Sequence, residues 1–287
     1  MGVRITTLAE NSTSRTGLLA EHGLSYLVEA DGRQTLFDTG QTTTAVHNAR
    51  ALGVDLSGVS AVVLSHGHFD HTGGLLDVLR AIGRGRREIE VIAHEAVFDL
   101  HYSVPQRRDG DGRPERPRYI GIPFSRAALE SEGAVFRLIQ GPVQLSDSVF
   151  VTGEVPRETL FEQIPPQFKL LADGGWAPDR LLDDQALVVR TDGGLVVVLG
   201  CGHSGIVNTL RHVRRIAGEA TFRAVLGGTH LGPAPKEQLE ATIGALRDFD
   251  IGRLGASHCT GLKAAARLAA ELGDSFVFDG AGSVLEL

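Results

Sequence analysis

Hydrophobic and polar positions divide the N-terminal third of the chain into short strand-like runs and two helical segments. Apolar alternation, or a short continuous apolar run, indicates a strand, and apolar residues spaced three or four apart indicate a helix. Ala45, Ala49 and Leu52 recur at helical spacing. We therefore expect strands over Val3–Leu8, Leu24–Ala30, Gln34–Asp38, Ser60–Leu64 and Ile89–Ala93, and helices over Thr42–Leu52 and Leu75–Ile82.

The C-terminal part of the chain repeats this order of elements. A hairpin is expected where Asp192-Gly193-Gly194 separates two apolar runs. The pattern predicts strands over Gln185–Thr191, Leu195–Gly200, Thr221–Leu226, Arg253–Ala256 and Phe276–Phe278, and helices over Gly205–Ile216, Lys236–Asp248 and Lys263–Leu272. Since each half begins with hairpins and continues as strand–helix alternation, we expect one α/β domain over residues 1–287, folded as an αββα sandwich.

Residues from about 99 to 180 interrupt this alternation, and we expect a loop-rich insertion there. Pro105–Arg118 is rich in Arg, Pro and Gly and has almost no apolar residue, which predicts a loop. Short strands are expected over Ala134–Ile139, Val143–Leu145 and Val149–Thr152, followed by an irregular stretch over Pro156–Pro178.

The composition is that of a globular protein with an acidic balance. Of the 287 residues 42% are hydrophobic, and the net charge is -7. A general nucleic-acid binder usually shows a basic field, so we expect no nucleic-acid partner, although a local basic pocket could still hold a small anion. No apolar run approaches the ~18 residues of a membrane span. Because the N-terminus also lacks the apolar core of a secretory signal, we expect a cytoplasmic protein without a membrane partner.

The strongest chemical feature is the cluster His66, His68, Asp70 and His71, which directly follows the apolar strand Ser60–Leu64. A turn from a strand into a helix can aim alternate side chains at one point, so His66 and His68 can share one ion while Asp70 and His71 face a second. Imidazole and carboxylate groups suit Zn²⁺, with Mn²⁺ or Fe²⁺ as alternatives. An idle histidine-rich surface turn would explain neither the apolar strand nor the aspartate.

The cluster resembles the H-x-H-x-D-H signature of the metallo-β-lactamase superfamily, and Phe37-Asp38-Thr39-Gly40 also matches that family. The resemblance implies that Asp38 orients the cluster. It further implies one later histidine for each ion, and His203 and His258, each just after a predicted strand, fit those positions. The alternative for both is a buried histidine with a structural role.

A departure from the family pattern occurs at Gly227-Gly228-Thr229-His230-Leu231, because the superfamily usually has a bridging aspartate in this region and none occurs here. His230 is therefore interpreted as a replacement ligand, as a catalytic acid near the metals, or as a structural residue. Cys201 and Cys259 each lie two residues or fewer from an expected ligand. Strand alternation would point their side chains away from the metals, so we expect small buried residues rather than a disulfide or a thiolate ligand.

Four further residues carry weaker hypotheses. His94 could line the pocket or begin a helix, and Asp184 could hold a ligand imidazole or hydrogen-bond at a strand start. Arg157 and Lys169 could bind an anionic substrate or lie solvated on the surface. The loop around Arg107–Arg118 could close over such a substrate, form the arm of a homodimer, or be a surface loop.

Ordered sequence blocks resemble one branch of the superfamily, which includes the archaeal dihydropterin-methyl-ribofuranosylaminobenzene phosphate synthase. The blocks begin at Leu64, Thr152, Asp183, Gly200, Gly227 and His258. The leading hypothesis is a metal-dependent hydrolase of an ester-like, phosphate-containing small molecule, in which Asp70 accepts a proton from water and His230 protonates the leaving group. The alternatives are a pterin-methyl transferase that releases pyrophosphate and, less favoured, an iron-binding redox or sensing protein.

Overall fold

The computed structural model describes residues 2–83, 88–105 and 115–287. Within these residues, seven strands form a first sheet in the order β18-β1-β2-β3-β4-β5-β8. The bounds of these strands are β1 (Arg4–Ala9), β2 (Ser25–Ala30), β3 (Arg33–Phe37), β4 (Val59–Val63), β5 (Ile89–His94), β8 (Ala134–Ile139) and β18 (Val284–Glu286).

A second sheet has the order β16-β15-β14-β13-β10-β9, and β17 pairs with β15 beside β16. A third, small sheet has the order β12-β11-β6-β7. The second sheet comprises β9 (Val143–Gln144), β10 (Val149–Val151), β13 (Ala186–Thr191), β14 (Gly194–Leu199), β15 (Thr221–Gly228), β16 (Asp250–Ile251) and β17 (Leu254–Ser257). The third comprises β6 (His101–Ser103), β7 (Arg118–Tyr119), β11 (Phe168–Ala172) and β12 (Gly175–Pro178).

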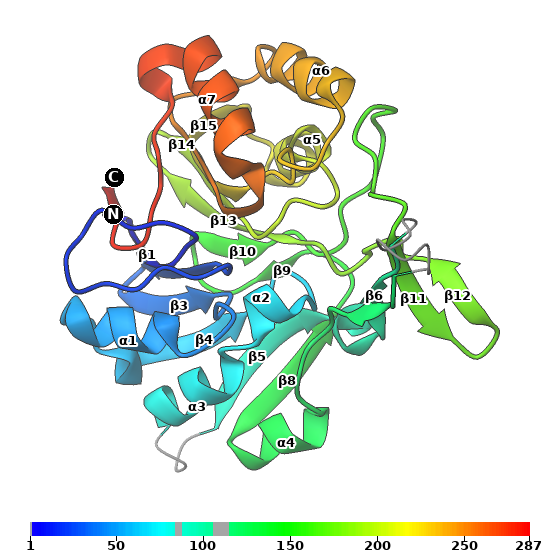
Figure 1. Ribbon diagram of the computed structural model, residues 1–287. Coiled ribbons are helices and arrows are strands. Elements are labelled where there is room, and N and C mark those ends of the chain that lie inside the picture. The colour runs from blue at the N-terminus through cyan, green and yellow to red at the C-terminus, as the bar shows by residue number, and fades with distance from the viewer. Residues whose placement is uncertain (1, 84–87, 106–114) are drawn as a thin grey trace.

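The two large sheets pack face to face, and helices cover the outer surface of each (Figure 1). The first sheet carries α1 (Thr44–Ala51), α3 (Leu75–Gly83) and α4 (Arg126–Ser131), and the second carries α5 (Ile206–Ala217), α6 (Lys236–Leu246) and α7 (Gly261–Leu272). Tyr26 and Phe37 are fully buried among the aliphatic side chains between the sheets. Removing this apolar surface from water stabilises the layers. The predicted αββα sandwich is confirmed.

The loops that follow the parallel strands lie at one edge of each sheet. In the first sheet β3, β4, β5 and β8 run parallel to one another, and in the second β14, β15 and β17 do so. The carboxyl ends of adjacent parallel strands lie at the same edge, which is where ligands usually bind in α/β folds. The short helix α2 (Phe69–Thr72) begins directly after the end of β4.

The stretch from about 99 to 180, expected to be a loop-rich insertion, supplies parts of all three sheets. β8 lies at the edge of the first sheet, and β9 and β10 belong to the second. Pro156–Pro178 is not irregular throughout, because β11 and β12 form an antiparallel hairpin within it. The hairpin escapes sequence patterning because it is only partly buried and shows no regular apolar face.

The end of the chain also differs from expectation. Phe276 makes only an isolated bridge with Leu254, so the predicted strand over Phe276–Phe278 does not form. The last strand is instead β18, which pairs antiparallel with β1 through the partners Arg4 and Glu286. β18 lies at a sheet edge and is mostly exposed, so it lacks the apolar signal of a buried strand.

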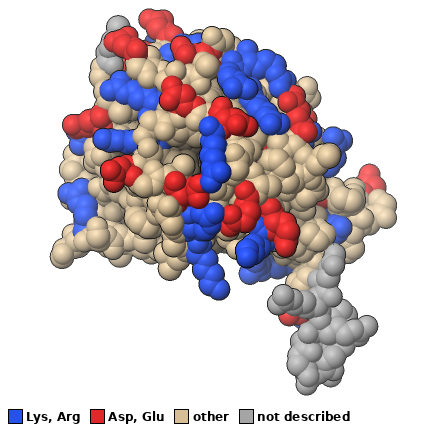
Figure 2. Space-filling view, turned by 90° about the horizontal axis from the view of Figure 1, so that it is seen from above, with Lys and Arg blue, Asp and Glu red and all other residues tan. Residues whose placement is uncertain are grey.

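Opposite charges are interspersed on the face that carries α5, α6 and α7, as Figure 2 shows. Part of this pattern comes from ion pairs between α6 and α7, such as Arg267 Nη2 with Glu240 Oε2 at 2.8 Å. No helix within the described ranges is long and apolar enough to cross a membrane.

A buried carboxylate, Glu162, anchors the start of α5. It accepts hydrogen bonds from the backbone N–H groups of Val207 at 2.8 Å and Asn208 at 2.9 Å, and from Thr159 Oγ1 at 3.0 Å. The first N–H groups of a helix have no partner within the helix, and a negative charge there also interacts favourably with the helix dipole. Glu162 thereby fixes the helix that follows His203.

We predict that Glu162→Ala lowers the free energy of unfolding by about 2 kcal/mol, because it leaves buried N–H groups without partners. Urea denaturation followed by circular dichroism measures this change. The matched control is Glu158→Ala, which removes a solvent-exposed pairing with Arg215 and should have a much smaller effect. Equal losses in the two variants would contradict the anchoring role.

Candidate metal centre

The candidate ligands all follow strand ends at one edge of the sandwich. Most lie within five residues of their strand, where the backbone leaves the sheet, and Asp70 and His71 lie in the short helix α2 that follows β4. Asp38 follows β3, the cluster His66, His68, Asp70 and His71 follows β4, Cys201 and His203 follow β14, His230 follows β15, and His258 follows β17. The sandwich thus brings together the side chains predicted from five separate sequence segments.

A first group of converging donors consists of His66, His68 and His203, one ligand atom from each lying within 4.8 Å of the others. The distance between His68 Nδ1 and His203 Nε2 is 3.2 Å. Ser65 Oγ lies 2.8 Å from His66 Nδ1, while His66 Nε2 is buried without a hydrogen-bond partner. Leaving a buried nitrogen unpaired is costly, and a metal ion shared by the three rings would satisfy it.

A second group adjoins the first and contains Asp70, His71, Cys201 and His258, with donor atoms again within 4.8 Å of one another. Asp70 Oδ2 lies 3.4 Å from His258 Nε2. The other ring nitrogen of His258, Nδ1, lies 2.8 Å from Asn11 Oδ1, which fixes the orientation of the ring. His71 and Asp70 therefore face a different point from His66 and His68.

The two groups share one orienting carboxylate, Asp38, which is fully buried. Its Oδ2 lies 2.6 Å from His71 Nδ1 and accepts a 2.7 Å hydrogen bond from Ser65 Oγ. Its Oδ1 accepts a 2.7 Å bond from the Ser65 backbone N–H. Because Ser65 Oγ also contacts His66, Asp38 orients one ring in each group.

Two adjacent aspartates before β13 fix the backbone around the first group. Asp183 Oδ2 accepts a 2.7 Å bond from the N–H of Gly67, which lies between two ligand histidines. Asp184 Oδ2 accepts a 2.7 Å bond from the N–H of Ser204, next to His203. Asp184 therefore acts on the backbone beside the ligand rather than on the imidazole, and Asp183 was not predicted.

Comparison with known proteins decides the family. The family model described as "Metallo-beta-lactamase superfamily" matches residues 19–212. The chain belongs to the metallo-beta-lactamase superfamily. It is 29% identical to 7,8-dihydropterin-6-methyl-4-(beta-D-ribofuranosyl)-aminobenzene-5'-phosphate synthase of Methanocaldococcus jannaschii, over 99% of this chain and 96% of that protein.

Solved structures agree with this assignment. The crystal structure of Tm1679, described as a metal-dependent hydrolase of the beta-lactamase superfamily, is 30% identical and superposes with a TM-score of 0.82 over 99% of each chain. A diphosphatase from the PhnP family shares the fold, with a TM-score of 0.55 and 15% identity over 100% of this chain and 98% of that one.

The donor set fits the divalent metals that this superfamily binds. Burial lowers the pKa of His68 to about 3, and burial together with neighbouring imidazoles keeps the pKa values of His66 and His203 well below their ordinary range. These rings are therefore neutral, which is the form that binds metal. Asp70 adds a carboxylate to the second group, and nitrogen and oxygen donors of this kind suit Zn²⁺.

The orientation of Cys201 differs from the one expected from strand alternation. Its side chain faces the site rather than pointing away, and its Sγ lies 3.1 Å from His71 Nε2. The alternation fails because β14 ends at Leu199 and the backbone then turns through Gly202, whose φ is +63°. Cys259 Sγ donates to the Cys201 carbonyl oxygen at 3.3 Å, and both cysteines are free thiols.

His230 lies beside the first group but outside both groups of converging donors. Its ring centroid is 4.4 Å from that of His203, and its backbone N–H donates to Cys259 Sγ at 3.3 Å. Burial lowers its pKa to about 4, so the ring is neutral near neutral pH. This position leaves the side chain available to contact a bound molecule.

Two histidines near the site were not predicted. His22 Nε2 lies 3.2 Å from Asp70 Oδ2, although its side chain is largely exposed. His101, from the small third sheet, is buried with Nδ1 2.6 Å from Asp179 Oδ2, and its ring stacks edge-on against His68 at 5.5 Å. Burial opposes the charged form of His101, but Asp179 and Asp183 raise its pKa to about 9. Neither residue belongs to a motif, and only the fold brings them to the cluster.

The three residues expected to contact substrate, His94, Arg157 and Lys169, do not line the cavity described below. His94 caps a short 3₁₀ helix over Glu95–Phe98, with its Nδ1 accepting from the Ala96 N–H at 3.1 Å. Arg157 donates to the carbonyl oxygens of His203 at 2.7 Å and Arg180 at 3.2 Å, so it braces the ligand backbone. Lys169 lies on β11 and does not line the metal cavity described below. Residues 107–114 of the arginine-rich loop lie outside the described residues.

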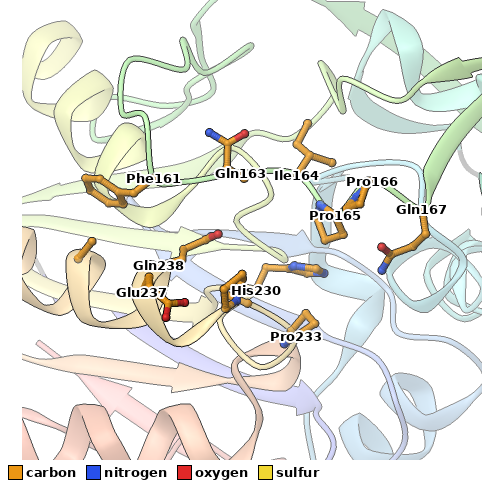
Figure 3. Close-up of a pocket in the computed structure, with 13 residues that line it drawn as sticks. Phe161, Gln163, Ile164, Pro165, Pro166, Gln167, His230, Pro233, Glu237 and Gln238 are labelled. Carbon is orange, nitrogen blue, oxygen red and sulfur yellow. The ribbon is translucent and has the colours of Figure 1, made fainter. Parts of the chain in front are cut away.

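Two cavities meet at this centre. One of about 450 Å³ opens onto the donors, and its wall includes His22, Asp70, Arg118 and His230. A second of about 590 Å³ shares His230 and Pro233 with the first. Figure 3 shows His230 between the segment that carries Pro165 and Pro166 and the helix that carries Glu237 and Gln238. The second cavity is mainly apolar, with Phe161 and Ile164 also in its wall.

We predict that His68→Ala lowers the metal content by about one ion per chain, because the first group loses one of its three donors. Mass spectrometry of the metals after desalting measures the content. The control, His94→Asn, replaces another buried histidine at a strand end and keeps a side-chain acceptor for the cap. Equal metal content in the two variants would show that the first group is not a metal site.

Proposed function

We propose that the chain is a metal-dependent hydrolase that acts on an ester-like, phosphate-containing small molecule. The observation that carries this proposal is the pair of adjoining donor groups at the base of a cavity of about 450 Å³. A cavity of this size suits a small molecule. We further propose Zn²⁺ at both groups, with Mn²⁺ or Fe²⁺ as alternatives.

The chemistry divides between the ions and the side chains of the chain. Divalent ions held here would lower the pKa of a bound water and polarise the ester or phosphoryl oxygen. Asp70, which borders the cavity, would accept a proton from the attacking water. His230, on the wall shared by the two cavities, has a neutral ring and would donate a hydrogen bond from its ring N–H to the leaving group.

The cavity wall also supports an anionic substrate. Arg118 lines the cavity from β7, at the end of the arginine-rich segment. A guanidinium group binds phosphate through several N–H donors in a planar arrangement. The phosphate-bearing part of the substrate would therefore lie between Arg118 and the metal donors.

Hydrolysis is tested by loading the purified protein with Zn²⁺ or Mn²⁺ and following release of p-nitrophenol from bis-p-nitrophenyl phosphate and from p-nitrophenyl acetate. We expect metal-dependent release from the phosphodiester, abolished by a chelator and restored by metal. A metal-loaded protein that hydrolyses neither ester would argue against the proposal.

We predict that Arg118→Ala raises KM for the anionic phosphodiester by roughly tenfold, the equivalent of one charge-assisted hydrogen bond. The KM for the neutral acetate ester should stay unchanged, since that substrate offers no phosphate to the guanidinium group. Arg116→Ala is the matched control, because Arg116 is an exposed arginine on the same segment that does not line the cavity. The same KM increase for both esters would contradict phosphate binding by Arg118.

A transferase is the second candidate, and the adjoining apolar cavity favours it. That cavity, of about 590 Å³, offers room for a second, aromatic reactant next to the donors. The relative in Methanocaldococcus jannaschii is named as a synthase whose product joins a pterin methyl group to an aminobenzene. In such a reaction the amino nitrogen of the aminobenzene would attack the methyl carbon, pyrophosphate would leave, and the nitrogen would lose a proton to solvent.

Pyrophosphate release from a 6-hydroxymethyl-dihydropterin diphosphate separates the two candidates. The assay is run with and without an aminobenzene riboside phosphate as acceptor. Release that requires the acceptor supports transfer, whereas equal release without it supports hydrolysis of this substrate.

A further inference from the structure

The second donor group contains a sulfur atom that the superfamily signature does not provide. Cys201 is 3% exposed, and its Sγ lies 3.1 Å from His71 Nε2. Donor atoms of Asp70 and His258 complete the same group, all within 4.8 Å of one another. His258 Nε2 is itself buried without a hydrogen-bond partner and faces this group.

The end of β15, where a bridging aspartate is usual, is closely packed at Gly228. A Cβ atom on Gly228 would lie 2.5 Å from the Gly200 carbonyl oxygen and 2.6 Å from Cys259 Sγ, closer than real Cβ atoms come to their neighbours. Thr229 is engaged in a 3.0 Å contact between its Oγ1 and that of Thr260. The segment after β14 that carries Cys201 packs directly against Gly228.

The structure holds Cys201 in place from both sides. Gly202 turns the backbone with a φ of +63°, which a residue with a side chain rarely adopts. The thiol of Cys259 donates to the Cys201 carbonyl oxygen at 3.3 Å. The sulfur of Cys201 is therefore aimed at the donor group, whereas that of Cys259 is engaged with backbone atoms.

We infer that Cys201 binds the second ion as a thiolate, together with Asp70, His71 and His258. The inference rests on the metal centre of the proposed function. On binding, the S–H bond breaks, a sulfur–metal bond forms, and the proton leaves to solvent. One thiolate and one carboxylate neutralise the double charge of the ion, and sulfur, nitrogen and oxygen donors together suit Zn²⁺.

Under this assignment the two ions have different roles. Four protein donors would complete the ligand set of the second ion, as is usual where zinc has a structural role. The three histidines of the first group leave a position open, as catalytic zinc sites do. Substrate and water would therefore bind at the first group, and the second would hold Asp70 and His71 in position.

Cobalt substitution tests the ligand without any activity assay. The metal-free protein is titrated with Co²⁺, and the near-ultraviolet absorption is recorded, because a thiolate bound to Co²⁺ gives a charge-transfer band there. We expect the wild-type protein to develop this band, Cys201→Ser to lose it together with about one ion per chain, and Cys259→Ser to keep both. Cys259→Ser is the matched control because it removes the neighbouring thiol.

X-ray absorption of the unmodified, zinc-loaded protein provides a second measurement that needs no variant. A sulfur shell near ~2.3 Å from zinc is expected. Two ions without a sulfur shell, or a charge-transfer band that survives in Cys201→Ser, would overturn the thiolate assignment and leave the proposed hydrolase intact. A wild-type chain that binds no divalent ion would overturn both.

Discussion

Burial of the Asp38 carboxylate is the constraint on which the metal centre depends. The residue lies directly after β3, is fully buried, and has a positive φ of 59°. A buried charge is tolerated only when it is paired and hydrogen-bonded, and Asp38 meets this requirement through the backbone and hydroxyl of Ser65 and through His71. Because the buried charge requires these hydrogen bonds, they fix the residues that follow β4. They thereby also fix the orientation of one ring in each donor group.

The sandwich brings the loops of two sheets together at one edge, so that donors from both sheets lie next to Asp38 and its partners. The first sheet supplies the cluster after β4, and the second supplies His203 after β14 and His258 after β17. Asp183 and Asp184 connect these halves, since they precede β13 but accept from Gly67 on one side and Ser204 on the other. Loops that would be mobile alone are thus tied to two rigid sheets, which keeps the donor atoms close to one another.

The small third sheet supplies side chains that surround the donor groups. It carries His101 and Phe168 against the ring of His68, and Arg118 to the cavity wall. The apolar cavity beyond His230 is lined by Pro165 and Pro166, which immediately precede β11. In the proposed hydrolase, substrate selection would therefore depend on the segment between the two halves of the sandwich, and metal binding on the halves themselves.

The sequence by itself determined the sandwich, the cluster at His66–His71 and the positions of His203 and His258, because strong apolar strands lead directly into short motifs. Only the tertiary structure decided which groups surround them. Cys201 faces His71 from a position 130 residues away in sequence, and His101 meets Asp179 across 78 residues. Such contacts leave no periodic signal in either segment, because they depend on how the backbone turns after a strand and on how separate sheets pack. The same reason explains why β11, β12 and β18, which are short and partly exposed, were not predicted, while the buried strands were.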